Sequence, residues 1–442
     1  MSMNEATATI DGTLNLGNAE AKAVGVDTAI RRHGDKSIWG IFIALCIISI
    51  IELYSASSRE VASAGIYGPI LRHMVMLVAG VAIVWSLEKI HYKRFFGFAY
   101  IFAFISFLMM VYVMFFGDII NGARRSFTIC SISIQPSEFL KLSAVLVIAR
   151  VMACSQKHKI RGVENRGLII SALIVLLFGG VLYPQGLTNT ILLMGISAAM
   201  MLIGGTEIKK LALVLLIYGC LGGMAHFGKA YIKEHSAPQN TEQTSQNTTI
   251  DRTDLRNGRL KAWNPFRAKY NDDINANNRQ EMYSYMAQAN GGVIGVFPGN
   301  SRETARLPLA FSDYIYAIII EDLGFVGGIL LMALYLCLLI RALQIARKCH
   351  RAFPVLLVMG MAIMIVLQAL FHMAITTGAF PVSGQPLPLI SKGGTSILIT
   401  SIAFGAMLSV SRSAVQNGTR KEVKEELNDL PEELHAENPV QL

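Results

Sequence analysis

Three carboxylates mark the start of a long apolar stretch in the second half of the chain. Asp313 precedes this stretch, and Glu321 and Asp322 lie within it. A carboxylate at the centre of a membrane helix costs about 2.5–3.5 kcal/mol to insert, and it is tolerated where it faces water, a partner or a cavity. Asp313 is placed at one membrane face, where it could act as an acid or base on an amphiphile. The alternative is that Ser312-Asp313 caps the helix that follows.

Glu321 and Asp322 are separated from Asp313 by more than two helical turns. They follow it by eight and nine residues, or about 12 Å along a helix. The three carboxylates therefore cannot form one compact site, which argues against a hydrolase that uses two carboxylates. We expect Glu321 and Asp322 to interact with a neighbouring helix.

Basic residues occur at two places in the first half of the chain. Arg124 and Arg125 are adjacent in a short loop, where they could bind a phosphate group or anchor the chain to lipid headgroups. Glu138 and Lys141 follow Pro136 at the start of an apolar run. Their spacing is typical of an ion pair in the first turn of a helix, but both side chains could also line a cavity.

The segment 381–396 combines Pro, Gly and hydroxyl residues beside an apolar helix. Irregular backbone at membrane depth occurs only where it is buried in protein or lines a cavity. The segment is therefore either a re-entrant structural turn or part of a cavity wall. We favour the cavity, because Lys392 needs water or an anion nearby, and Ser396 would then lie beside it.

These residues must be positioned by membrane helices. Of the 442 residues, 53% are hydrophobic and only 16% are charged, and a bilayer is crossed by about 20 apolar residues. We therefore predict an all-α polytopic membrane protein of about ten transmembrane helices. The apolar runs lie near 38–54, 70–87, 95–116, 138–154, 167–183, 187–205, 208–227, 313–341, 354–376 and 386–411.

Charge and loop lengths predict the topology. The net charge of +9 reflects Lys and Arg in alternate loops and not affinity for nucleic acid, so both termini are expected in the cytoplasm. The predicted parts are a cytoplasmic tail (1–37), a transmembrane domain (38–412) and a second cytoplasmic tail (413–442). The domain includes a large outward loop (228–312). Within that loop Met282, Tyr285, Met286 and Ala289 have helical spacing, which predicts an amphipathic helix at the outer surface. Gly291 to Gly299 predict a tight turn.

Taken together, the blocks resemble the SEDS family (shape, elongation, division and sporulation) of FtsW/RodA-type peptidoglycan polymerases. The resemblance covers roughly residues 38–412. The matching blocks are Asn121–Arg125, Gln135–Lys141, Gly291–Ser301, Leu307–Asp313, Glu321–Gly324 and Pro381–Ser396. The sequence departs from the usual pattern of the family at four positions. Leu309 and Phe311 stand where many members carry Glu and His, Gln185 stands where Asp is usual, and Phe297 stands where Gly is frequent.

The resemblance implies a fold and a reaction. The fold is ten transmembrane helices with a large outward loop between the seventh and eighth. The reaction is glycosyl transfer from lipid II at the outer face of the membrane, with release of undecaprenyl diphosphate. Asp313 matches the family's essential acid and would be the general base. Arg124, Arg125, Glu138, Lys141, Ser312, Lys392 and Ser396 are the expected substrate-binding residues. A divalent Mg or Mn ion at the diphosphate is left open.

The resemblance also implies partners and a location. The expected partner is a class B penicillin-binding protein, a transpeptidase, together with other divisome membrane proteins and membrane lipids. The polar tails at both ends favour the cell-division branch, hence the bacterial cytoplasmic (inner) membrane at the septum. Two other functions remain open. A lipid II flippase would need a polar path across the whole membrane, and a non-catalytic divisome scaffold would tolerate substitution of the cavity residues.

Overall fold

The computed structural model describes most of the predicted transmembrane domain. The described residues are 34–56, 67–120, 123–129, 132–156, 162–235, 273–274, 278–307, 310–413 and 438–440. Most of both predicted tails and much of the predicted loop 228–312 lie outside these ranges, as does Leu309.

Each of the ten predicted apolar runs contains a helix. Seven of the helices in the described residues are long and apolar enough to cross a membrane, so the chain is a multi-pass membrane protein. The helices that match the runs are α2 (Lys36–Ala56), α4 (Tyr67–Glu88), α5 (Lys93–Phe116), α6 (Pro136–Cys154), α7 (Asn165–Leu182), α8 (Leu187–Ile203), α9 (Ile208–His235), α12 (Ile315–Lys348), α13 (Ala352–Thr376) and α14 (Gly394–Ser413).

Three helix boundaries differ most from the predicted runs, and one of them is the end of α12, which was predicted near 341 but lies at Lys348. The last run was predicted to begin near 386, but α14 begins at Gly394, because Pro386, Pro388 and Gly393 interrupt helical backbone before it. The seventh run was predicted to end near 227, whereas α9 continues to His235. Residues 183–186 form the tight turn between α7 and α8.

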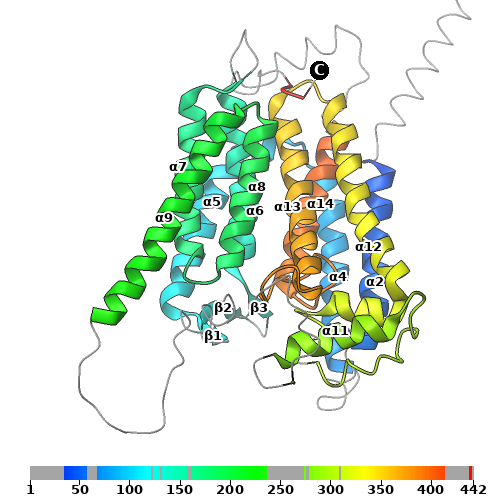
Figure 1. Cartoon of the computed structure of the whole chain (residues 1–442). Helices are drawn as coiled ribbons and strands as arrows, with labels where there is room; N and C mark the ends of the chain where they lie inside the picture. The colour runs from blue at the N-terminus through cyan, green and yellow to red at the C-terminus, as the bar shows by residue number, and fades with distance from the viewer. Residues whose placement is uncertain are drawn as a thin grey trace, which may run out of the picture.

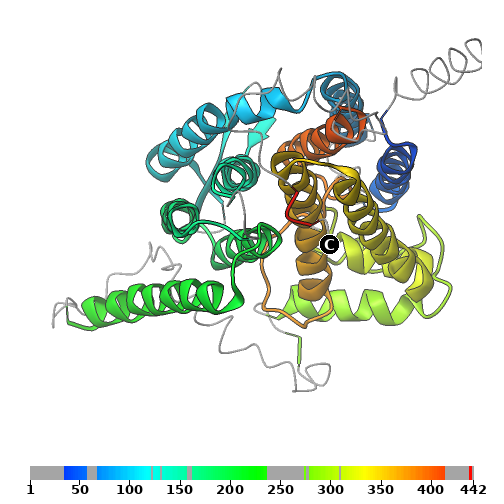
Figure 2. The ribbon, with the colours of Figure 1, turned by 90° about the horizontal axis from the view of Figure 1, so that it is seen from above.

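The helices form one bundle whose buried centre contains α6, α13 and α14 (Figures 1 and 2). Nearly every residue of α13 is buried. By contrast, α5, α7 and α9 expose large apolar side chains such as Phe104, Leu173 and Leu216, as expected of helices that face lipid tails. Figure 2 shows that α9 extends away from the bundle.

One end of the bundle, opposite the C-terminal segment, carries a small sheet and a short helix (Figure 1). The sheet is antiparallel, in the order β1 (Asp118–Ile120), β2 (Ala123–Ile129) and β3 (Ile132–Ile134). Phe127 pairs with Ile134. No strand was predicted here, although residues 131–134 alternate Ser and Ile, the period-2 pattern of a strand. The described strands form this one small sheet in an otherwise helical fold.

The predicted amphipathic helix and the glycine-rich turn are both present. The helix is α11 (Arg279–Gly291), and its buried residues include Met282 and Ala287. It packs against α12, and a Cβ at Gly291 would collide with the Ile320 carbonyl oxygen. The buried face of α11 is formed by Met282, Ser284, Ala287 and Gly291. Ala289, which was predicted to belong to the apolar face, is exposed.

The turn after α11 is bonded to a break in α12. Gly324 has a φ of 72° inside α12, a conformation that glycine adopts without steric cost. The Val296 N–H donates to the Glu321 carbonyl at 2.9 Å, and the Phe325 N–H donates to the Gly292 carbonyl at 3.0 Å. The break in α12 and the turn therefore form one hydrogen-bonded unit.

Candidate active site

The irregular segment between α13 and α14 has its backbone satisfied by side chains of the surrounding helices. The Tyr335 hydroxyl donates to the Pro388 carbonyl at 2.6 Å, and Gln368 Nε2 donates to the Pro386 carbonyl at 3.2 Å. His372 Nδ1 lies 2.6 Å from the Gln385 carbonyl. These bonds explain how non-helical backbone persists between membrane helices.

The same segment is joined to the turn that carries Asp313. The Lys392 N–H donates to the Phe311 carbonyl at 3.0 Å, and the Ser391 hydroxyl donates to the Ser312 carbonyl at 2.7 Å. The Lys392 ammonium also lies 4.8 Å from the centre of the Phe311 ring, a cation–π contact. Residues about 80 positions apart in the chain thus form one wall.

Two further walls come from the first half of the chain. The Thr395 hydroxyl donates to the Ser133 carbonyl at 2.8 Å and accepts from the Gln135 N–H at 3.2 Å, which joins the start of α14 to β3 and α6. On the α4 side, His73 Nε2 lies 2.8 Å from the Ser49 hydroxyl of α2. Residues of α4, β2, β3 and the segment 384–397 line one space.

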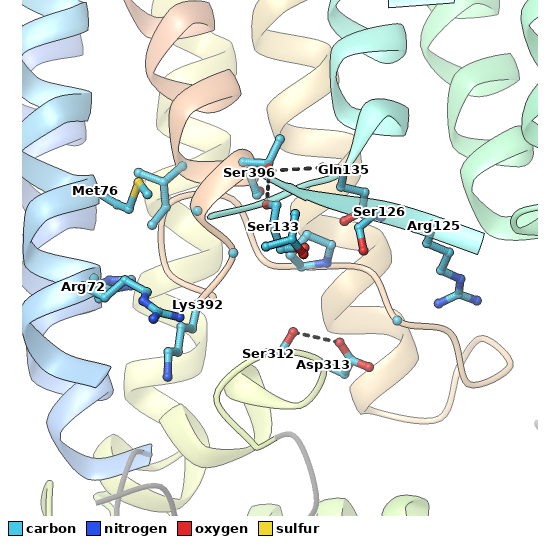
Figure 3. A pocket seen from close by; sticks show the side chains of 18 residues that line it. Arg72, Met76, Arg125, Ser126, Ser133, Gln135, Ser312, Asp313, Lys392 and Ser396 are labelled. Carbon is cyan, nitrogen blue, oxygen red and sulfur yellow. Dashed lines mark hydrogen bonds between the residues drawn. The ribbon is translucent and has the colours of Figure 1, made fainter. Parts of the chain in front are cut away.

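That space is a cavity of about 550 Å³, a size typical of ligand sites. Figure 3 shows Arg72 and Lys392 on one side of it and Arg125 on the other, with Ser312 and Asp313 between them. Asp313 is the only carboxylate among its described lining residues, whereas three Arg or Lys side chains line it. A cavity with this excess of positive charge suits an anionic ligand.

The Asp313 carboxylate has Ser312 and Gly384 as close neighbours. Ser312 donates a hydrogen bond to Asp313 Oδ1 at 3.0 Å, and Gly384 passes so close that a Cβ there would lie 3.0 Å from Oδ2. Asp313 precedes α12, which begins at Ile315, and α12 has no side-chain capping bond at its N-terminus. The N-cap position of α12 is Tyr314, the residue after Asp313.

The structure brings together five of the predicted site residues and separates three. Arg125, Ser312, Asp313, Lys392 and Ser396 all line the cavity. Arg124 is exposed on β2 and does not line it, because adjacent residues on a strand point to opposite faces. Glu138 and Lys141 also do not line it.

Glu138 and Lys141 instead form the ion pair predicted for the first turns of a helix. Lys141 Nζ lies 2.7 Å from Glu138 Oε1 and donates to Gln368 Oε1 of α13 at 2.9 Å. Both residues are buried. The pair joins α6 to α13 directly behind the cavity, since Gln368 also bonds to the segment at Pro386. Substrate contact by Glu138 or Lys141 stays a prediction.

Sequence reasoning missed Arg72 and His73, which both line the cavity. They lie within the apolar run of α4, where an adjacent Arg and His are unexpected. A charged residue inside a membrane helix is by default a functional candidate, and that signal could have identified them. Glu321 and Asp322 lie outside the cavity, as their distance from Asp313 along the helix predicted.

These features define a polytopic membrane protein with a cationic cavity at one end of its helix bundle. Residues 35–416 match the profile of the FtsW/RodA/SpoVE family, described as cell cycle proteins. The chain belongs to this family, which confirms the resemblance found in the sequence.

Relatives align along most of the chain. The probable peptidoglycan glycosyltransferase FtsW of Bacillus subtilis is 28% identical over 408 residues, covering 89% of this chain and 94% of the relative. The stage V sporulation protein E of the same organism is 27% identical, covering 84% of this chain and 95% of the relative.

Solved structures show the same fold. A chain of a peptidoglycan synthase complex, described as coordinating polymerization and crosslinking, has a TM-score of 0.66 at 23% identity and covers 87% of this chain and 99% of its own length. The crystal structure of the rod shape determining protein RodA of Thermus thermophilus has a TM-score of 0.60 at 22% identity, covering 87% of this chain and 98% of its own length. The helical fold predicted from the sequence is therefore confirmed.

Proposed function

We propose that the chain is a peptidoglycan glycosyltransferase that polymerises lipid II at the outer face of the bacterial cytoplasmic membrane. The observation that carries this proposal is the cationic cavity with a single carboxylate, Asp313, among its described lining residues. Lipid II presents a diphosphate next to its sugars, and the related FtsW of Bacillus subtilis is described as a probable peptidoglycan glycosyltransferase, which supports the reaction class.

Asp313 is the proposed general base. Its carboxylate accepts the proton of the acceptor sugar's hydroxyl as that oxygen attacks the anomeric carbon of the donor, and the bond from that carbon to the diphosphate breaks. Ser312 orients the carboxylate by its hydrogen bond to Oδ1. The second oxygen, Oδ2, faces Gly384, where no side chain blocks it. Correct orientation of a base and its substrate supplies much of the rate enhancement in such a reaction.

The leaving group is undecaprenyl diphosphate, and its developing negative charge is the main electrostatic problem of the reaction. Arg72, Arg125 and Lys392 line the cavity around Asp313. Fixed positive charges aimed at a leaving group are usually the largest single contribution to catalysis. We assign diphosphate binding to these three residues, with the Ser396 side chain beside them.

A divalent Mg or Mn ion remains a separate proposal. The described residues contain no group of three or more His, Cys, Asp or Glu that could hold a metal ion. Asp313 is the one carboxylate that the described cavity wall offers. Such an ion would therefore be carried mainly by the diphosphate, where it would offset negative charge, and no step above depends on it.

We further propose that the chain acts at the division septum with a class B penicillin-binding protein and other divisome membrane proteins, with both termini in the cytoplasm. The related peptidoglycan synthase complex supports a partner of the transpeptidase kind. The polar tails of the sequence support the division branch. A fluorescent fusion that forms septal rings would support this location, and patches along the side wall would contradict it.

The test is lipid II polymerisation by the purified chain with its cognate transpeptidase, comparing wild type with Asp313→Asn. The matched control is Asp273→Asn, because Asp273 is exposed outside the cavity and uses only its backbone carbonyl in a hydrogen bond. We expect glycan strands from wild type and the control but not from Asp313→Asn, with complex formation equal in all three. Equal polymerisation by Asp313→Asn would remove Asp313 as the base. Movement of lipid II across the bilayer without any polymerisation would instead support a flippase.

A further inference from the structure

Two carboxylates outside the cavity are completely buried and have no described function. Glu52 lies near the end of α2, and Asp322 lies on α12 beside the Gly324 break. Both residues are 0% exposed. None of their four carboxylate oxygens has a hydrogen-bond partner among the described residues. Buried polar groups without partners are rare and indicate a water, an ion or a functional role.

The two carboxylates belong to one cluster. α2 packs against α12, and the glycine-rich turn is bonded to both: the Phe297 N–H donates to the Asp322 carbonyl at 2.9 Å, and the Gly299 N–H donates at 3.1 Å to the hydroxyl oxygen of Ser55, which follows Glu52 on α2. The Ser55 side chain lies beside Asp322. The cluster thus contains four carboxylate oxygens and one hydroxyl at the junction of α2, α12 and the glycine-rich turn.

The neighbouring Glu321 is a buried carboxylate whose oxygens do have hydrogen-bond donors, so it is a useful comparison for Asp322. It accepts a bond from the Ser301 hydroxyl at 2.5 Å and from the Arg302 N–H at 3.0 Å. It therefore joins α12 to the loop after the turn. Asp322, the next residue, is equally buried but has no such donors.

Two unpaired carboxylates buried together need a compensating positive charge or a proton, because burial and mutual repulsion both disfavour their charged forms. An all-oxygen cluster is the ligand set of hard cations, and Ca²⁺ accepts carboxylates in mono- or bidentate fashion together with hydroxyl, carbonyl or water oxygens. A single divalent ion also neutralises both charges. We propose that Glu52 and Asp322, with the Ser55 hydroxyl, bind one hard divalent cation of the Ca²⁺ type at the junction of α2 and α12.

The described residues contain no group of three or more His, Cys, Asp or Glu that could hold a metal. The site therefore relies on two carboxylates and a hydroxyl, and the ion takes its remaining ligands from backbone or water. Occupancy would fasten α2 to the turn at Gly299 through Ser55. That turn leads into the segment that carries Asp313, so the ion stiffens the outer part of the structure without entering the active cavity.

The experiment measures cation binding and thermal unfolding of the full-length purified protein in detergent after treatment with EDTA. Radioactive calcium gives the number of ions bound per chain, and unfolding is followed with and without CaCl₂. The variants are Glu52→Gln and Asp322→Asn, and the matched control is Glu164→Gln, whose side chain is exposed. Neither readout requires activity, so the result does not depend on the proposed reaction.

We expect wild type and Glu164→Gln to bind one calcium ion and to unfold a few degrees higher with CaCl₂. Glu52→Gln and Asp322→Asn should lose both effects. Glu52→Gln should also be at least as stable as wild type in EDTA, because it removes a buried charge while keeping the shape of the side chain. The proposal is overturned if wild type shows neither binding nor a shift, which would mean that a shared proton satisfies the pair. It is also overturned if all four proteins respond equally, which would indicate calcium on the surface or on lipid.

Discussion

Gly384 lies directly against the carboxylate of Asp313, so that a Cβ at position 384 would be 3.0 Å from Oδ2 and 3.5 Å from Cγ. Gly384 belongs to the irregular segment before α14, and Asp313 precedes α12. The absence of a side chain at 384 therefore leaves room for the proposed base on one side, while Ser312 holds it on the other. The direction in which Asp313 points depends on a residue that has no chemistry of its own.

Gly384→Ala should therefore lower glycan polymerisation without preventing folding. The new methyl group would lie 3.0 Å from Asp313 Oδ2, which is closer than nearly all Cβ contacts in proteins. The carboxylate must therefore move by a few tenths of an ångström. Misplacing a catalytic group by up to 1 Å costs on the order of 10–100-fold in rate. The measurement is the rate of lipid II polymerisation at saturating substrate.

Gly97→Ala is the control for this substitution. A Cβ at Gly97 of α5 would meet nothing within 4 Å, and replacing glycine within a helix favours the folded state. Its polymerisation rate should match wild type. A Gly384→Ala protein as active as Gly97→Ala would show that the position of Asp313 does not limit the reaction.

The adjacent pair Arg124 and Arg125 offers a second comparison. Arg125 lines the cavity, whereas Arg124 is exposed and does not. Arg125→Ala should reduce kcat on the order of 10²-fold, as expected when one fixed charge at a leaving group is removed. Arg124→Ala should have little effect on kcat. Equal losses of kcat in both variants would indicate that the net charge of β2 matters, and not the position of Arg125 in the cavity.

The buried pair of Glu138 and Lys141 is expected to contribute to stability. Lys141→Met leaves the Glu138 carboxylate buried with its cation removed, a change that typically costs about 3–5 kcal/mol. The double variant Lys141→Met/Glu138→Leu should recover much of the loss, because no unpaired charge remains. The measurement is the unfolding midpoint of each protein in detergent. A double variant less stable than Lys141→Met would show that the pair is needed for more than charge balance.

The opposite end of the bundle has an ion pair that should depend on pH. Arg341 donates to both Asp35 oxygens, with Nη2 at 2.6 Å from Oδ2. Burial alone would raise the pKa of Asp35. The Arg341 hydrogen bonds and the Ile38 and Ser37 N–H groups outweigh it, so the pKa lies below 3.8.

Because the pKa of Asp35 is lowered by folding, the charged form stabilises the folded state above pH 3.8, and this contribution is lost as the pH falls below 3.8 through the folded-state pKa. Asp35→Asn should lower stability by up to about 1 kcal/mol near neutral pH. The difference from wild type should shrink in acid. Unfolding midpoints between pH 6 and pH 3 test this, and a difference that stays constant over that range would contradict it.

The sequence predicted the helices well because apolar runs of sufficient length leave few alternatives in a membrane. It also predicted Asp313 as an acid or base at one membrane face and Lys392 as a residue of a cavity wall, and both line the cavity. The glycine-rich turn was recognisable for a similar reason. Close approach between backbones, as at Gly291 and Ile320, requires glycine.

Other features depend on contacts between parts of the chain that are distant in sequence, and the sequence alone does not predict such contacts. Whether Arg124 or Arg125 enters the cavity depends on strand register, which one short loop does not reveal. The pairing of Glu52 with Asp322 joins residues 270 positions apart. Arg72 and His73 carried a signal, an unexpected Arg and His inside an apolar run, that was overlooked.

The segment 381–396 is hydrogen-bonded to Ser312, to Ser133 and to the helices α12 and α13. This segment follows most of the other helices in the sequence, so Arg72 and Arg125 are synthesised before the segment that completes the cavity. The cationic site therefore comes into existence only near the end of synthesis. Truncated chains that reach the bilayer would carry the positive charges of the site but no assembled place to transfer a sugar.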